Sequence, residues 1–346
     1  MMQNIFVGFT LAYLSLLTGC AHTYSRFRPS QESPQVCEQK AGSDIEMARR
    51  WAHSGHLWRA LETYRNIHRL YPNTSFAPVA LHEMAQIYVR RRQYNSGFGA
   101  LREITQNYHR YPRFDAVIGE QFDIACHLMR GYRPYYLGII PGFRDRDSSV
   151  EFFESVVDRA PFDKRAPKAL MYIAKISRNG GAKTKAIEAL DRLIEHYPGD
   201  PSIPEAYRLK AETCLSFVRG PQYDQAFTQR AIRCYEDFLA IFDSHTDGPS
   251  IPEEEIQRVK EGLQKAKSLR AESRLVAGDF FYHRRHYGKG ALIFYEEATA
   301  LAPGTPVANM ARFRMEDIQN GIGAPLNLLD RLLGPYKHLS PEPESR

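Results

Sequence analysis

The chain has 346 residues, 43% hydrophobic and 25% charged, which is enough to bury a substantial core in one large domain, two smaller ones or an elongated array. No segment after residue 19 is long and apolar enough to cross a membrane, so further spanning helices are not expected. The formal net charge of +6 suits anionic lipid headgroups or an acidic partner, and it does not by itself indicate nucleic acid.

Residues 1–19 predict an export signal. They contain no charged side chain, and their apolar stretch is shorter than the roughly 20 residues that span a bilayer. The ending Leu17-Thr18-Gly19-Cys20 resembles a bacterial lipobox, so we expect cleavage before Cys20 and acylation of this cysteine, with palmitate among the acyl chains. A terminus with two or more acyl chains is stably anchored. The start of the chain lacks the usual Lys or Arg, which leaves open an ordinary signal peptide that ends near a cysteine.

The residue after Cys20 favours sorting to the outer membrane. Ala21 stands where a signal for retention in the inner membrane usually has Asp. We therefore expect a lipid-anchored protein on the periplasmic face of the bacterial outer membrane. An exported protein rarely meets nucleic acid, so none is expected as a partner.

Four cysteines remain after Cys20, and their spacing matches no zinc site. An oxidising periplasm would allow a disulfide between Cys214 and Cys234. The alternative, which we favour, is that these cysteines are small buried residues. The sequence does not decide between the two.

A repeated register runs through the chain. Several segments end at a proline that has an alanine twelve residues before it and a large apolar residue eight before it. The prolines are Pro72, Pro112, Pro198 and Pro303, the alanines Ala60, Ala100, Ala186 and Ala291, and the large residues Tyr64, Ile104, Leu190 and Tyr295. Weaker copies have Ser149 and Phe153 before Pro161, and Ala231 and Tyr235 before Asp243. A small residue lets two helices approach closely, and proline stops a helix.

The register recurs about every 40 residues, close to the tetratricopeptide period of about 34. We therefore predict an all-α fold, a superhelix of tetratricopeptide-type helix–turn–helix units with about six helix pairs plus a capping helix over 305–319. No segment alternates with period two, so no strand is expected. The predicted organisation is a signal peptide at 1–19, a flexible tether at 20–43, the repeats at 44–319 and a Pro-rich tail at 320–346.

An insertion at 131–147 interrupts the third unit and is the best candidate for a binding surface. It is richer in aromatic residues than a solvated loop requires, and it ends in alternating charges. These side chains would either pack over the superhelix or form an aromatic wall for an extended peptide or a partner. The candidate residues for partner or client binding are Tyr132, Tyr135, Tyr136, Phe143, Arg144, Asp145, Arg146 and Asp147.

Lipobox, register and insertion together resemble the BamD family, the tetratricopeptide lipoproteins of the bacterial β-barrel assembly machinery. In that family an acidic and arginine-rich loop follows an aromatic, glycine-containing insertion, and Arg144-Asp145-Arg146-Asp147 carries the match here. The resemblance covers about 44–319. It implies two partners: the periplasmic domains of an outer-membrane barrel assembly protein, and unfolded outer-membrane protein clients recognised through their C-terminal strand. The segment 201–262 and the tail depart from the family by their added length.

We therefore expect a scaffold that helps to assemble outer-membrane β-barrels. The alternative is a tetratricopeptide lipoprotein scaffold of another envelope complex, such as polysaccharide export or cell-wall assembly. No catalytic residue, metal site or cofactor is expected. His82-Glu83 resembles the beginning of the zinc-protease motif His-Glu-x-x-His, but Gln86 stands where the motif needs its second histidine. The oligomeric state is not predicted.

Overall fold

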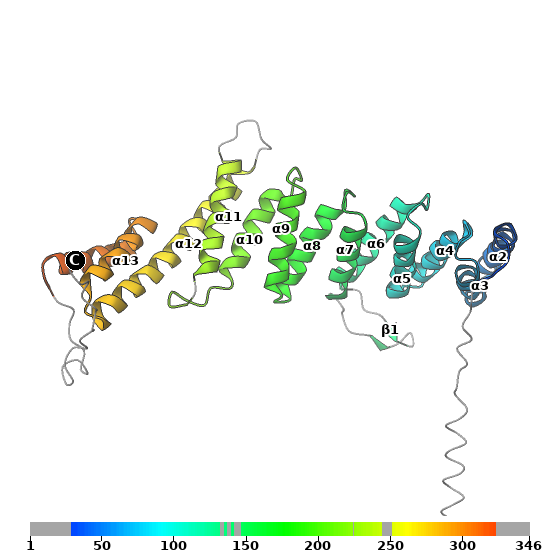
Figure 1. Ribbon diagram of the computed structural model, residues 1–346, viewed down its shortest axis with the longest axis horizontal. Coiled ribbons are helices and arrows are strands. Elements are labelled where there is room, and N and C mark those ends of the chain that lie inside the picture. Colours follow the sequence, from blue (N-terminus) through cyan, green and yellow to red (C-terminus); the bar gives the residue numbers. More distant parts are fainter. Residues whose placement is uncertain are drawn as a thin grey trace, which may run out of the picture. The chain divides into compact units, whose positions relative to one another are not determined.

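The computed structural model describes residues 29–131, 135–136, 140–141, 147–223, 225–243 and 251–322. Within these residues it contains thirteen α-helices, one π-helical turn and a single pair of two-residue strands (Figure 1). The prediction of an all-α fold of helix–turn–helix units is confirmed. None of the helices in this part of the chain has the length and apolar character that crossing a bilayer requires.

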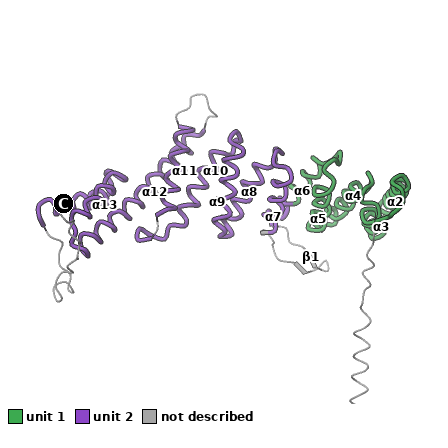
Figure 2. Tube along the Cα trace, in the orientation of Figure 1, with its two compact units in different colours: residues 1–124, 134–141 green, residues 125–133, 142–346 purple. Residues whose placement is uncertain are grey.

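The chain divides into two compact units, which are described separately (Figure 2). Unit 1 comprises residues 1–124 and 134–141, and unit 2 comprises 125–133 and 142–346. The helices of unit 1 are α2 (Pro34–His53), α3 (Leu57–Leu70), α4 (Phe76–Arg90), α5 (Tyr94–Asn107) and the first part of α6 (Phe114–Met129). Helices α2 and α3 pack as a hairpin, α4 and α5 as a second one, and α3 joins the two hairpins by packing on α4.

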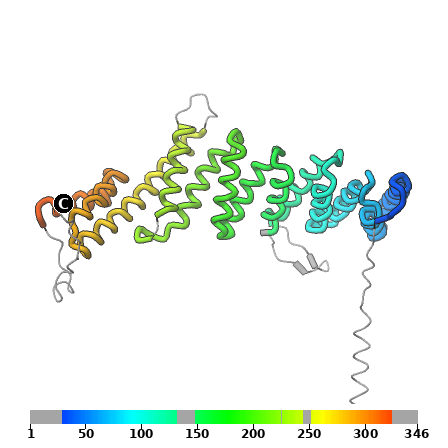
Figure 3. The backbone as a smooth tube through the Cα atoms, in the orientation of Figure 1, coloured from blue at the N-terminus to red at the C-terminus, as the bar shows by residue number. Residues whose placement is uncertain are grey.

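Unit 2 continues the same arrangement. Its elements after the end of α6 are α7 (Asp147–Arg159), α8 (Ala166–Asn179), α9 (Lys183–His196), α10 (Ile203–Leu215), α11 (Ala226–Phe242), α12 (Glu253–Asp279), η1 (Phe280–Arg284), α13 (Gly288–Leu301) and α14 (Pro306–Gln319). Each hairpin packs on the next, which Figure 3 lets the reader follow in sequence order. Within unit 2 the helices α8 and α9, α10 and α11, and α12 and α13 pack as hairpins, and α14 packs on α13 where the capping helix was predicted.

The expected start of the repeats is wrong by ten residues. Helix α2 begins at Pro34, so residues 34–43 belong to the first hairpin and not to the tether. Cys37 and Ala41 are buried at helical spacing, and Pro34 occupies the first helical turn, where its missing N–H costs nothing. Residues 1–28, which contain the predicted signal peptide and Cys20, lie outside the described part of the chain, as do residues 323–346 of the tail.

The insertion also differs from expectation, because it contains β-structure. The strands β1 (Tyr135–Tyr136) and β2 (Ile140–Pro141) pair antiparallel, with Tyr136 opposite Ile140. A strand pair this short carries no readable alternation of apolar and polar residues, so the sequence pattern could not indicate it. The insertion lies where it was predicted, between α6 and α7.

The alanine register is confirmed by burial. The small residue twelve before each repeat end is buried in all six copies, and so is the large residue eight before it. The buried pairs are Ala60 and Tyr64, Ala100 and Ile104, Ser149 and Phe153, Ala186 and Leu190, Ala231 and Tyr235, and Ala291 and Tyr295. These residues lie on the second helix of each pair, where they face neighbouring helices.

We expect Ala186→Leu to lower the free energy of unfolding by about 1–3 kcal/mol, because extra methylenes in a packed contact force neighbouring side chains out of place. Ala186 is fully buried in α9, whereas Glu188, two residues along, is exposed. The matched variant Glu188→Leu should be nearly neutral. Urea unfolding of both variants measures the difference, and equal effects would mean that the register has no structural meaning.

Five of the turns that follow the first helix of a pair use a left-handed residue. Gly55 has φ 80°, Gly131 85° and Gly181 84° at the end of the first helix of a pair. Arg92 and His286 adopt φ 57° and 52° at the equivalent turns, which is unusual for residues with a Cβ atom. These five turns therefore share a backbone geometry although the residue type differs, whereas none of the described residues between α10 and α11 is left-handed.

Gly181→Ala is expected to cost about 1 kcal/mol of unfolding free energy, since an L-residue pays about that much in the left-handed region. A Cβ atom at Gly181 would meet no atom within 4 Å, so the cost would be purely conformational. Gly199 has the same open surroundings without the left-handed φ. Gly199→Ala is thus the control and should be neutral or slightly stabilising in the same thermal or urea melt.

The additional material at 201–262 forms part of the unit 2 core. Helix α12 passes close to two tyrosines: a Cβ atom would lie 2.7 Å from the Tyr235 ring at Gly262 and 2.5 Å from the Tyr295 ring at Gly278. Cys214 and Cys234 are free thiols in the same buried cluster. Burial raises the pKa of Cys214 to about 11. The interpretation of these cysteines as small buried residues is the one that the structure supports.

Candidate functional site

The predicted binding residues of the insertion fall mostly outside the described residues. This applies to Tyr132 and to Phe143 with Arg144, Asp145 and Arg146. Tyr135 and Tyr136 form β1, and Asp147 begins α7. The assignment of a partner surface to the insertion therefore stays a prediction.

We expect the double variant Tyr135→Ser, Tyr136→Ser to reduce partner capture and to leave the melting temperature nearly unchanged. Buried aromatic anchors at interfaces contribute about 2 kcal/mol or more to binding. Pull-down from native membranes, together with thermal melting, measures both effects. A large drop in melting temperature with intact capture by the folded fraction would instead make these tyrosines part of the core.

A groove in unit 1 was not predicted and is the best-defined site in the described part of the chain. It has a volume of 1270 Å³ and is lined by the end of α2, the first half of α3, α4 and the turns after α3 and α5. Small-molecule pockets usually hold about 300–1,000 Å³. The groove is therefore large enough for a segment of polypeptide.

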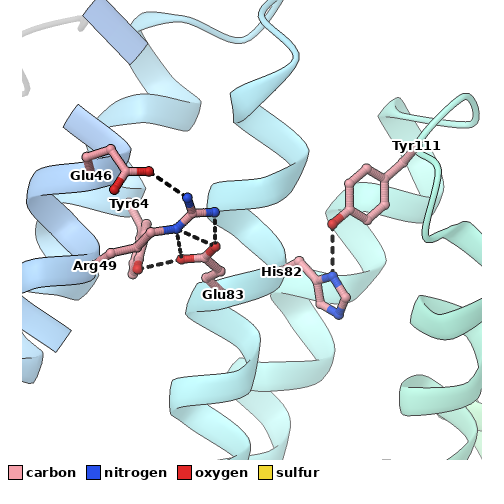
Figure 4. Close-up of polar contacts among 6 residues, drawn as sticks. All are labelled: Glu46, Arg49, Tyr64, His82, Glu83 and Tyr111. Atoms are coloured by element: carbon pink, nitrogen blue, oxygen red, sulfur yellow. Dashed lines mark hydrogen bonds and ion pairs between the residues drawn. The ribbon is translucent and has the colours of Figure 1, made fainter. Parts of the chain in front are cut away.

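An ion-pair network closes one wall of the groove (Figure 4). The Arg49 guanidinium on α2 donates from Nε and Nη2 to Glu83 on α4, at 3.0 and 2.6 Å to Oε1, and it also reaches Glu46 at 2.7 Å. The Tyr64 hydroxyl donates to the other Glu83 oxygen at 2.7 Å. Hydrogen bonding to Glu83 raises the pKa of Arg49, and burial raises the pKa of Tyr64. The network joins α2, α3 and α4 and holds both charges in fixed positions.

A second polar cluster lies deeper on α4. His82 is buried, with its Nδ1 3.0 Å from the Tyr111 hydroxyl and its Nε2 2.9 Å from Glu120 Oε1 on α6. Figure 4 shows His82 and Tyr111 facing each other, and the two rings meet edge to face at 5.8 Å. Burial raises the pKa of Tyr111. The tyrosine of this Tyr-Pro repeat ending thus serves to position the histidine.

The groove carries an excess of positive charge. Four arginines line it against one glutamate, Glu83, which is already paired with Arg49. The other three, Arg90, Arg110 and Arg113, are exposed, and none of them forms an ion pair within the described residues. Leu57, Phe76, Val79 and Ile87 add apolar surface. The site therefore suits an extended ligand with apolar side chains and carboxylate groups.

The sequence contained only partial signals of this groove. His82 and Glu83 stood out as an incomplete zinc motif, and Arg90 begins the basic run Arg90-Arg91-Arg92. The partners that give these residues a role are 34 to 38 positions away in the chain, as for Arg49 with Glu83 and His82 with Glu120. A search for charged residues one repeat apart could have found the pairs.

Comparison with known proteins gives partial matches. Residues 168–200, which include most of α8 and α9, match the tetratricopeptide repeat family. Over 93 residues the chain is 27% identical to the outer membrane protein assembly factor BamD of Caulobacter vibrioides. That alignment covers 27% of this chain and 30% of the relative, so the chain spans about a third of the relative's length.

Two solved structures of helical-repeat proteins are also similar. A tetratricopeptide repeat protein from Parabacteroides merdae matches at a TM-score of 0.29 and 10% identity, covering 80% of this chain and 99% of the other. The TPR2AB domain of yeast Sti1 matches at a TM-score of 0.24 and 11% identity, covering 80% and 96%. Both scores are too low for a conclusion about this chain. The matches together identify tetratricopeptide-type repeat sequence at 168–200 and a limited similarity to one BamD protein.

Proposed function

We propose that this protein is a periplasmic scaffold of the β-barrel assembly machinery, anchored in the outer membrane through Cys20. In this role it binds the barrel assembly protein and segments of client outer-membrane proteins. The observation that carries the proposal is the basic, partly apolar groove of unit 1. The similarity to the C. vibrioides assembly factor BamD supports the choice of machinery.

The groove fits binding better than catalysis. Glu83 accepts hydrogen bonds from Arg49 and Tyr64, and His82 lies between Tyr111 and Glu120, so these titratable groups hold helices together. The side chains left with free charge are arginines, which recognise carboxylates well and act poorly as acids or bases. An extended client strand would offer apolar side chains and a terminal carboxylate to this surface.

Co-purification from native membranes tests the choice of complex. After mild detergent extraction, the tagged full-length protein should retain a large outer-membrane barrel assembly protein. Retention of polysaccharide-export or cell-wall assembly proteins in its place would favour the alternative scaffold role. Mass spectrometry of the retained proteins distinguishes the two outcomes.

A further inference from the structure

The closed end of the first hairpin has an unusual composition. We call residues 50–59 the α2–α3 tip: they comprise the last turn of α2, the turn itself and the start of α3. Both tryptophans of the chain, Trp51 and Trp58, lie in these ten residues. No Asp or Glu occurs between Glu46 and Glu62, so the tip carries only basic and neutral side chains.

The tip is exposed where burial would be expected. The Trp58 side chain is 74% exposed, although a tryptophan usually buries most of its surface. Arg59 lies over the Trp51 ring, its Cζ 4.8 Å from the ring centroid, and His56 meets the same ring edge-on at 5.5 Å. Arg50, Arg59 and His56 are themselves exposed. An aromatic and cationic surface, held in place by these ring contacts, is therefore exposed to solvent.

These residue types match the interface between a bilayer and water. Tryptophan rings favour the headgroup level of a membrane, because the ring is apolar and its N–H still needs a polar partner. Basic residues next to them gain from anionic lipid phosphates, by about fivefold in membrane partition for each residue. An acidic protein partner would also pair with the arginines; the membrane is favoured because the position where the described chain begins leaves the tip within reach of a bilayer that holds Cys20.

That position is set by a backbone contact. The Ser30 amide donates to the Leu70 carbonyl at 2.9 Å, so the described chain begins at the open end of the hairpin, opposite the tip. The ten residues from Cys20 to Ser30 can span at most about 33–36 Å. Helix α3, with 14 residues, is only about 21 Å long. A chain anchored at Cys20 can therefore place the tip on the same membrane surface.

We propose that the α2–α3 tip binds the headgroup region of an anionic phospholipid bilayer, with Trp58 inserted and Arg50 and Arg59 on lipid phosphates. The reach argument rests on the proposed lipid anchor, whereas the composition of the tip does not. His53 and Leu57 of the tip also line the groove. When the tip is bound to the membrane, one end of the groove would therefore lie next to the bilayer into which the client protein is inserted.

Tryptophan fluorescence tests the proposal on the full-length acylated protein. Both tryptophans of the chain lie in the tip, so the tryptophan emission reports on the tip alone. The protein is reconstituted into vesicles of phosphatidylcholine alone, or of phosphatidylcholine with phosphatidylglycerol. We expect a blue shift and quenching by brominated lipid only with phosphatidylglycerol present. Trp58→Ser should remove most of the quenching. Arg50→Gln and Arg59→Gln should each shift the tip about fivefold toward the free state.

Arg69→Gln is the matched control, because Arg69 is exposed at the opposite end of α3, and it should change nothing. Equal emission in both vesicle types, or unchanged quenching in Trp58→Ser, would overturn the proposal. The proposal would also be overturned if the tryptophan emission shifted when barrel assembly protein was added but did not shift with either type of vesicle. Failure of the anchor itself has another signature: the protein would not sediment with phosphatidylcholine vesicles, while the tip would still respond to phosphatidylglycerol.

Discussion

Reversing three charges in the groove, with Arg90→Glu, Arg110→Glu and Arg113→Glu together, is expected to weaken client binding by at least about tenfold, or about 1.4 kcal/mol. The three arginines face the groove without an ion-pair partner in the described residues, so they are available to ligand carboxylates. Glutamates there would repel the same ligand. Fluorescence anisotropy with a labelled peptide from the C-terminal strand of an outer-membrane β-barrel protein measures the affinity.

The control for this variant carries the same change in charge elsewhere. Arg69, Arg233 and Arg312 are exposed, form no ion pair in the described chain and lie outside the groove. Their triple reversal to Glu should leave the affinity within a factor of about two, since remote surface charges are screened by salt. Both triple variants should unfold at nearly the same temperature as the parent protein. Equal loss of affinity in the two would show that net charge, and not the groove, attracts the peptide.

Cys20→Ala is expected to move the protein from the membrane fraction to the soluble or unprocessed fraction. Two or more acyl chains bind a bilayer almost permanently, and the variant has no site for them. Fractionation and metabolic labelling with palmitate measure the loss. Cys37→Ala, which removes a buried cysteine of α2, is the control and should remain membrane-bound. A Cys20→Ala protein that stays entirely at the membrane would contradict the lipoprotein assignment.

The repeat architecture could be predicted from the sequence because its signals are local. Ala186 and Leu190 lie four residues apart on one helix, and Pro198 ends the repeat two residues after that helix, so a single window of the chain carries the information. The capping helix and the place of the insertion followed from the same spacing. The start of α2 was missed because Pro34 and the polar residues around it are as typical of a tether as of a first helical turn.

The groove could not be predicted in the same way because it depends on how hairpins stack. Glu83 has a role only because α4 places it beside Arg49 of α2 and Tyr64 of α3. His82 likewise needs Tyr111 from the end of its own repeat and Glu120 from α6 of the next one. No motif spans these pairs, and the packing of neighbouring hairpins decides which face of α4 lines a cavity.

The most direct test of the proposed function is photo-crosslinking in the native membrane from a residue inside the groove. Gln86 lines the groove and is only partly exposed, so a photoreactive amino acid placed there reports on what enters it. The same amino acid at Glu188, exposed on α9, is the control. We predict crosslinks from position 86, and not from 188, to an outer-membrane barrel assembly protein or its unfolded clients. Two results would contradict the proposed function. One is that position 86 crosslinks only to proteins of another envelope complex, and the other is that it gives no more crosslinked product than position 188.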